Sequence, residues 1–240
     1  MYDRQYMPLF LDLSSRKIVI FGGGHVGQRK ASLFYKYGEV TVISEDFSEK
    51  IISLYASEAI NIVQADIRAM SSDAIHEYLK GAFIVIPATN DQKLNMKISQ
   101  IAAGMDIFVN SVDSRGDVIV PSVIQRGPVT VGISTLGHSP ALSRYTRIKL
   151  EHTITPNYAD MAHLQDELRT NLKKRIESQP LRKQILWDVL EDDRIWDAFE
   201  ESYEKAYNIA YDIMLEQIEN SGNENSKEHL DHCSNNGGQH

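Results

Sequence analysis

The sequence has little cysteine, no long apolar run and no excess of positive charge. Its single cysteine, Cys233, lies in a polar stretch among 240 residues, which excludes a disulfide framework. No run of about 18 apolar residues occurs, so we expect no membrane span. The first residues also lack the basic-then-apolar pattern of a secretion signal. A cytoplasmic location is therefore the expectation.

The charge balance bears on the class of partner. Acidic residues outnumber basic ones by 33 to 25, and the formal net charge is −8 at pH 7. Such a balance argues against nucleic acid and against an anionic membrane surface as partners. It is compatible with a local basic pocket for an acidic small molecule. With 42% hydrophobic residues, the chain has enough apolar sequence for one large domain or two small ones.

The first half of the chain alternates short apolar runs with helix-like stretches. The runs are continuous and rich in β-branched residues, which is typical of parallel strands covered on both faces. Right-handed crossovers between such strands give an open, doubly wound sheet, so we predict an α/β fold. The predicted strands are 17–21, 40–44, 62–64, 83–87 and 107–112, and the predicted helices are 26–37, 45–58, 72–80 and 94–103.

The pattern changes after Asp113. Two further strands are predicted at 118–125 and 129–134, joined by the turn-forming sequence around Gly127-Pro128. A helix start follows at Ser139-Pro140. Helical spacing then continues to about residue 218, with interruptions at Pro156 and Pro180, and places Trp187 and Trp196 in a core. The polar stretch 220–240 is expected to be disordered. We thus predict domains at 1–113, 114–150 and 151–219, followed by this tail.

A glycine-rich turn follows the first strand. Gly22, Gly24 and Gly27 form the pattern G-x-G-x-x-G, with His25 and Val26 inside it. The first glycine permits a tight turn, the second lets a pyrophosphate approach the backbone, and the third allows the helix to pack closely on the strand. The helix N-terminus adds free N–H groups and partial positive charge. The pattern predicts a dinucleotide site; the alternative is a glycine-rich turn that binds nothing.

Polar residues at the ends of the second and fourth strands extend this prediction, and Ser44, Glu45, Thr89 and Asn90 are predicted to bind the cofactor. Glu45 or Asp46 could accept hydrogen bonds from ribose hydroxyls, which would favour NAD over NADP. In the alternative, Ser44 caps a helix whose first turn carries both carboxylates. Thr89-Asn90-Asp91 follows the fourth strand, and this segment could line the cofactor site, cap the next helix, or do both.

Several segments together resemble a known family. They occur in the right order over residues 7–215, and V-P-S-x-I and S-x-x-G-x-S-P-A are the most specific. The chain resembles the precorrin-2 dehydrogenase and sirohydrochlorin ferrochelatase family, which includes the dehydrogenase module of siroheme synthases. The segments are MPLF (7–10), KIVIFGGGHVGQRKA (17–31), ATND (88–91), NSVD (110–113), VPSVI (120–124), STLGHSPA (134–141) and W187 to R194.

The resemblance implies an N-terminal NAD-binding Rossmann domain, a central dimerisation region and a C-terminal helical domain in a homodimer. It implies oxidation of precorrin-2 to sirohydrochlorin, with NAD as the cofactor and hydride acceptor. Some members also insert ferrous iron, as a substrate, to give siroheme. No resident metal site is predicted. The alternative is an NAD-binding regulatory module without catalysis.

The resemblance also implies a site beyond the fifth strand. Asp113 is the favoured acid–base residue, although an aspartate in this position could simply cap a turn. The segment 111–150 is basic within an acidic protein, which suits a substrate with many carboxylates. Its arginines could equally be surface or dimer-interface charges, and its polar loop could serve only to start a helix. The predicted substrate-binding residues are Asn110, Arg115, Ser134, Thr135, Gly137, His138 and Arg144.

Overall fold

The chain forms two compact units. The structure, a computed structural model, describes residues 5–111 and 116–234, with side chains as far as 220. One unit comprises Met1–Pro121 and Ser134–Pro140, and the other Ser122–Ile133 and Ala141–His240. The first unit extends past residue 113 because Asp117 and Val118 both donate backbone hydrogen bonds to Val109 O, at 2.8 and 3.2 Å. The hairpin segment predicted to start a separate region therefore groups with the helices that follow.

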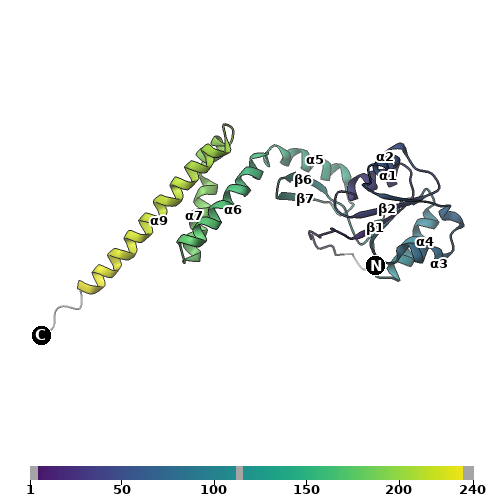
Figure 1. Cartoon of the computed structure of the whole chain (residues 1–240), viewed down its shortest axis with the longest axis horizontal. Helices are drawn as coiled ribbons and strands as arrows, with labels where there is room; N and C mark the ends of the chain where they lie inside the picture. The colour runs from purple at the N-terminus through teal and green to yellow at the C-terminus, as the bar shows by residue number, and fades with distance from the viewer. Residues whose placement is uncertain (1–4, 112–115, 235–240) are drawn as a thin grey trace. The chain divides into compact units, whose positions relative to one another are not determined.

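The first unit contains the predicted parallel sheet (Figure 1). Its five strands run in the order β3-β2-β1-β4-β5 and all pair in parallel, which confirms the predicted fold class. The last strand is shorter than predicted, although Asn110 N still donates to Val85 O at 2.9 Å beyond its end. The strands are β1 (Lys17–Phe21), β2 (Glu39–Ser44), β3 (Asn61–Gln64), β4 (Ala82–Pro87) and β5 (Phe108–Val109).

Helices cover both faces of this sheet. α1 (His25–Phe34) and α2 (Glu49–Ala56) pack on one face, in a core with Ile18 and Ile20. The short helix η1 (Ile67–Ala69), α3 (Ser72–Leu79) and α4 (Gln92–Ala103) pack on the other, with Val19 and Phe21. Successive side chains of β1 point alternately into these two cores, which explains why the run from Ile18 to Phe21 is apolar throughout. The chain order reverses between β1 and β4, and ligands bind at such a switch point in open α/β sheets.

The second unit joins an antiparallel hairpin to helices. The hairpin turns at Gly127, whose φ of +53° suits glycine. The interruptions predicted at Pro156 and Pro180 are confirmed, since α6 begins just after the first and α7 carries the second in its first turn. The elements are β6 (Ser122–Arg126), β7 (Val129–Ile133), α5 (Pro140–Glu151), α6 (Asn157–Arg175), α7 (Gln179–Glu191), α8 (Asp193–Ala198) and α9 (Tyr203–Ser234).

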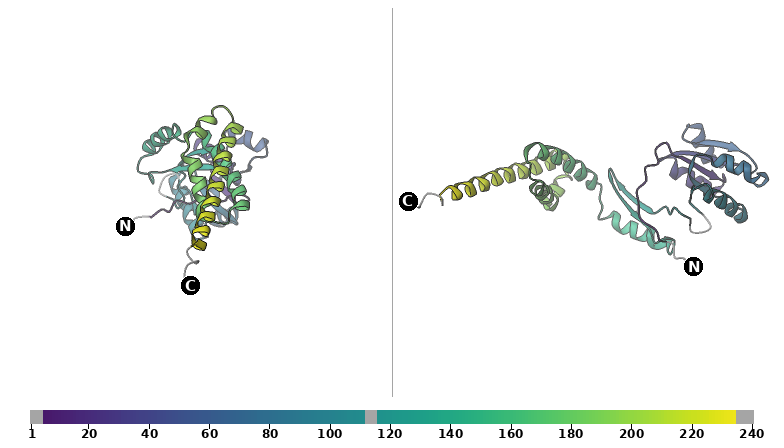
Figure 2. Two further views of the ribbon diagram at one scale, coloured as in Figure 1. Left: turned by 90° about the vertical axis from the view of Figure 1, so that its left-hand side faces the viewer. Right: turned by 90° about the horizontal axis from the view of Figure 1, so that it is seen from below.

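Two predictions for the helical part were wrong. Trp187 is 55% exposed and its Nε1 donates to Glu191 Oε1 at 2.6 Å, whereas Trp196 packs against the core as predicted. The stretch from residue 220 to Ser234, predicted to be disordered, continues α9 without a break (Figure 2). Extending a helix that already exists avoids the cost of nucleation, so a polar sequence without proline can follow it. No helix among the described residues is both long and apolar enough to cross a bilayer.

The buried sheet core yields a stability prediction. Ile20 is fully buried in β1, and Ile20→Ala should lower the free energy of unfolding by about 2–5 kcal/mol. Ile52 on α2 is 51% exposed, and Ile52→Ala, which removes the same atoms, should change it by less than about 0.5 kcal/mol. Urea denaturation of the two variants measures the difference. Equal losses would contradict the assignment of β1 to the core.

Candidate dinucleotide-binding site

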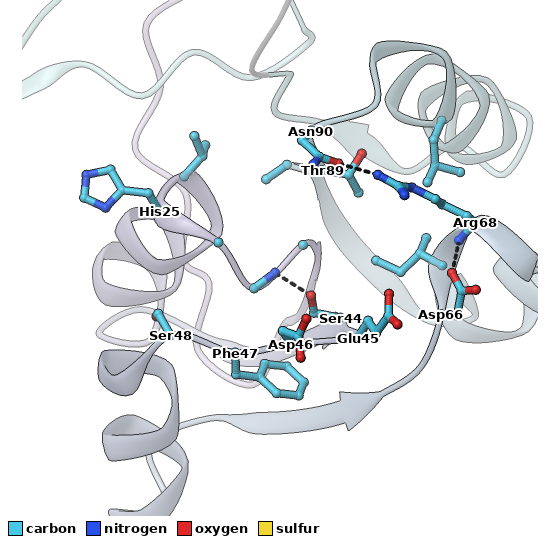
Figure 3. A pocket seen from close by; sticks show the side chains of 17 residues that line it. His25, Ser44, Glu45, Asp46, Phe47, Ser48, Asp66, Arg68, Thr89 and Asn90 are labelled. Carbon is cyan, nitrogen blue, oxygen red and sulfur yellow. Dashed lines mark hydrogen bonds between the residues drawn. The ribbon is translucent and has the colours of Figure 1, made fainter.

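A cavity of about 580 Å³ lies at the carboxyl ends of β1 to β4 (Figure 3). It therefore sits at the switch point between β1 and β4. Its walls come from the glycine-rich loop, the loops that follow β2 and β4, and the turn that leads into η1. The lining residues are Gly22, Gly23, Gly24, His25, Val26, Ser44, Glu45, Asp46, Phe47, Ser48, Asp66, Ile67, Arg68, Ala88, Thr89, Asn90 and Leu94.

The glycines of the loop differ in what surrounds them. A Cβ on Gly22, whose φ is +115°, would lie 2.4 Å from Ala88 O, and one on Gly27 would lie 1.8 Å from Gly22 O. Both positions hold backbone segments too close together for a side chain. A Cβ on Gly24 would meet nothing within 4 Å, and this residue is exposed at the cavity. The protein itself leaves that space open, as the close approach of a pyrophosphate requires.

The start of α1 suits the same anion. Gly24 is its N-cap and provides no side-chain cap, and the first turn carries no acidic residue. The N–H groups of this turn thus lack a side-chain acceptor at the end of the helix that carries partial positive charge. The loop and the helix start together fit the diphosphate of a dinucleotide.

The loop after β2 resolves one alternative. Ser44 Oγ accepts a hydrogen bond from Gly23 N at 2.8 Å, and α2 begins later, capped by Ser48, whose Oγ accepts from Ile51 N at 3.4 Å. The alternative in which Ser44 caps a helix was therefore wrong. Glu45 and Asp46 lie in the loop, exposed and lining the cavity, where ribose hydroxyls are expected.

The loop after β4 is held by its own side chains. The Thr89 hydroxyl donates to Asn95 Oδ1 at 2.7 Å, and Asn95 Nδ2 donates to Thr89 O at 3.0 Å. The predicted cap of the next helix is present, since Asp91 Oδ1 accepts from Lys93 N and Leu94 N at the start of α4, at 2.9 and 3.1 Å. These hydrogen bonds fix the conformation of the cavity wall at this point without a ligand.

Sequence reasoning missed the wall formed after β3. Asp66 Oδ1 accepts from Arg68 N at 2.9 Å and thereby starts η1. Arg68 Nη2 then donates to Asn90 Oδ1 at 3.1 Å, and Figure 3 shows this bond between the β3 and β4 sides of the cavity. The side chain of His25 points away from Glu45 and Asn90 in the same view. The aspartate two residues after β3 was the available signal, because aspartate is a favoured N-cap residue.

The predicted substrate residues are less completely described. Asp113 and Arg115 lie outside the described residues. Asn110 is buried, and both ends of its amide are engaged: Nδ2 donates to Val118 O at 2.7 Å, and Oδ1 accepts from Lys30 Nζ at 2.6 Å. The amide thus holds other groups in place, and Lys30 is a neighbour that the sequence did not indicate.

The polar loop before α5 is closed on itself. Thr135 Oγ1 accepts from Ser139 N at 3.0 Å and donates to Ser139 O at 2.9 Å. Ser134 Oγ accepts from Leu136 N at 3.0 Å, His138 N donates to Thr135 O at 2.9 Å, and Gly137 has a φ of +82°. These hydroxyls shape the turn. Their role in substrate binding stays a prediction.

Two arginines of the basic segment lie one turn apart on α5 and differ in their contacts. Arg144 is exposed on α5, in the second unit, whereas Arg147 forms an ion pair with Glu151 one turn further along the same helix. The substrate contact of Arg144 stays a prediction.

The glycine-rich turn, the acidic loop after β2 and the cavity at the switch point define a Rossmann-type NAD(P)-binding protein. The family model described as putative NAD(P)-binding matches residues 9–122, which span the whole sheet.

The chain belongs to the precorrin-2 dehydrogenase family. It is 50% identical over 216 residues to the precorrin-2 dehydrogenase of Methanosarcina barkeri, a match that covers 90% of this chain and 96% of that protein. The solved structure of SirC, a precorrin-2 dehydrogenase, superposes with a TM-score of 0.66 at 25% identity, over 90% of this chain and 100% of that one. A siroheme synthase from Vesicomyosocius okutanii is 32% identical, over 77% of this chain but 39% of its own length.

The contrast between Gly24 and Gly27 can be tested directly. Gly24→Ala adds a methyl group that meets no protein atom, so the fold should persist while NAD binding weakens by about tenfold or more. Gly27→Ala forces a Cβ against Gly22 O and should lower the thermal unfolding midpoint. NAD titration and thermal unfolding of both variants provide the measurements. Unchanged NAD affinity in Gly24→Ala would overturn the assignment of this space to the cofactor.

Proposed function

We propose that this protein oxidises precorrin-2 to sirohydrochlorin in siroheme biosynthesis, with NAD as the cofactor. The observation that carries the proposal is the 50% identity to a precorrin-2 dehydrogenase over 96% of that protein's length. The open space at Gly24 supports it, because the dinucleotide has a place to bind. A cytoplasmic location, expected from the composition, belongs to the same proposal.

The chain's own residues supply binding and orientation. Gly24 and the first turn of α1 hold the diphosphate, and Glu45 or Asp46 accepts from the adenosine ribose, which favours NAD over NADP. Thr89 is fixed by Asn95 and lines the part of the cavity nearest β5. When bound, NAD accepts the hydride that leaves the macrocycle. The residues named here fix where that transfer occurs and keep the cofactor from shifting.

A proton leaves the macrocycle together with the hydride. Asp113 follows β5 by a few residues in sequence and is our candidate for accepting it, as a carboxylate near the reacting ring. The same carboxylate would take protons from pyrrole nitrogens if the protein also inserts ferrous iron, which is a substrate in that reaction. Arg115, Arg144 and the loop 134–138 are our candidates for binding the carboxylates of the tetrapyrrole.

The reaction is tested by anaerobic incubation with precorrin-2 and either NAD or NADP, while the absorbance of the reduced cofactor and of sirohydrochlorin is followed. We expect both to appear together with NAD, and more slowly with NADP. Gly24→Ala, assayed beside the wild type, should reduce the rate. Ferrous iron added after the oxidation shows whether siroheme also forms. A folded, NAD-binding protein that leaves precorrin-2 unchanged would instead favour a regulatory module.

We further propose that the protein is a homodimer formed through α5. Leu142, Tyr145 and Ile148 are 53%, 59% and 42% exposed and recur every three residues, so they form an apolar stripe along one side of this helix. A second copy of the same helix is the occupant with matching chemistry, since an isologous interface pairs a surface with itself.

The dimer predicts a change of mass in solution. Tyr145→Glu places a charge in the stripe and should convert the dimer to a monomer at micromolar concentration, as measured by sedimentation. Ile52→Glu alters a residue on α2 that is 51% exposed, close to the 59% of Tyr145, and should leave the mass unchanged. A monomeric wild type, or a dimer that tolerates Tyr145→Glu, would contradict this interface.

A further inference from the structure

Lys30 occupies an unusual position for a lysine. It lies in the second turn of α1, is partly buried, and donates from Nζ to Asn110 Oδ1 at 2.6 Å. Asn110 cannot rotate away, because its Nδ2 donates to Val118 O at 2.7 Å and its backbone N donates to Val85 O at 2.9 Å. The ammonium is thus held beside the end of β5, where the backbone is already fixed to β4 on one side and to the segment 116–118 on the other.

The electrostatics of this position favour an anionic partner. Within the described residues, no carboxylate forms an ion pair with Lys30. Burial lowers the pKa of the Lys30 ammonium, and the positive charge of Arg29 lowers it further. A neutral donor such as glutamine could satisfy Asn110 without this desolvation cost. A partly buried cation held by a neutral amide is therefore better explained by an anion that arrives with a ligand.

The sheet places this cation beside the dinucleotide site. β5 neighbours β4 in the order of strands, and the register pairs Val85 with Val109. Asn110 thus lies level with the last residues of β4, which lead directly into Ala88 and Thr89 of the cavity wall. None of the described residues that follow β5, 110–111 and 116–121, lines that cavity. Lys30 consequently lies toward the β5 side of the cavity, away from the loop after β2 that carries Glu45 and Asp46.

We propose that Lys30 is a substrate-binding residue that forms an ion pair with a side-chain carboxylate of the tetrapyrrole, and that Asn110 is the positioning residue that holds its ammonium. The inference rests on the proposed function, because the carboxylates belong to precorrin-2 and sirohydrochlorin. It assigns one fixed contact at the end of β5 and explains why Asn110, with both amide ends engaged, acts through Lys30.

The experiment compares three variants in sirohydrochlorin and NAD titrations. Lys30→Gln keeps a donor for Asn110 but removes the charge, so sirohydrochlorin affinity should fall by about tenfold or more while NAD affinity stays unchanged. Lys30→Arg retains the charge and should recover part of the affinity. Arg29→Gln removes the same charge from the neighbouring, exposed residue and should leave both affinities unchanged. In turnover with precorrin-2, Lys30→Gln should raise KM more than it lowers kcat.

A measurement on the wild type covers the case in which Lys30→Gln does not fold. Sirohydrochlorin should protect Lys30 from an amine-modifying reagent, detected by mass spectrometry, whereas NAD alone should not. Lys36, exposed on the surface after α1, should be modified equally with and without the ligand.

The outcomes separate this inference from the function on which it rests. If the wild type oxidises precorrin-2 but Lys30→Gln binds sirohydrochlorin as tightly as the wild type, or Lys30 stays unprotected, the role of Lys30 is wrong and the function stands. If the wild type neither oxidises precorrin-2 nor binds sirohydrochlorin, the proposed function fails and the tetrapyrrole contact fails with it.

Discussion

The structure of the site depends on a close approach between backbone segments at the end of β1. Gly22 lies against the carbonyl of Ala88, and Gly27 lies against the carbonyl of Gly22, at distances that leave no room for a Cβ. The first approach joins the ends of β1 and β4 on the two sides of the switch point, and the second seats α1 on the sheet. Only glycine meets both requirements, because any side chain would force the two strand ends or the helix apart.

That constraint also orders the rest of the site. With α1 fixed, its N-terminus faces the cavity and its second turn carries Lys30 to the end of β5. The same helix therefore presents its N-terminus to the proposed diphosphate site and the Lys30 ammonium to the end of β5. The loops after β2 and β4 then complete the walls through bonds of their own, Ser44 to Gly23 and Thr89 to Asn95. These two loops are already held by hydrogen bonds within the protein. Ligand binding therefore costs less conformational entropy than it would if the loops had to become ordered.

Local patterns predicted the features that local physics decides. The apolar runs predicted the parallel sheet, because a strand covered on both faces has no polar positions. The spacing of the glycines predicted the turn after the first strand. Contacts between residues far apart in the sequence could not be predicted from these local patterns. The helix predicted from residue 45 begins at Glu49 in the structure, because the Ser44 hydroxyl accepts from Gly23 N and does not cap a helix. The spacing of apolar residues in α7 did not reveal that the side chain of Trp187 is exposed. In the sequence Lys30 is one of several basic residues on a predicted helix. Its contact with Asn110, 80 positions away, becomes visible only in the fold.

The hydrogen bond between Ser44 and Gly23 has a consequence for how cofactor preference could evolve. The Ser44 hydroxyl links the loop that we propose binds the ribose, which carries Glu45 and Asp46, to the loop that we propose binds the diphosphate. Remodelling that loop to accept an additional phosphate would disturb the anchor of the glycine turn as well. Nucleotide selectivity and diphosphate affinity in this protein are thus linked traits, and a change in one has to be accommodated by the other.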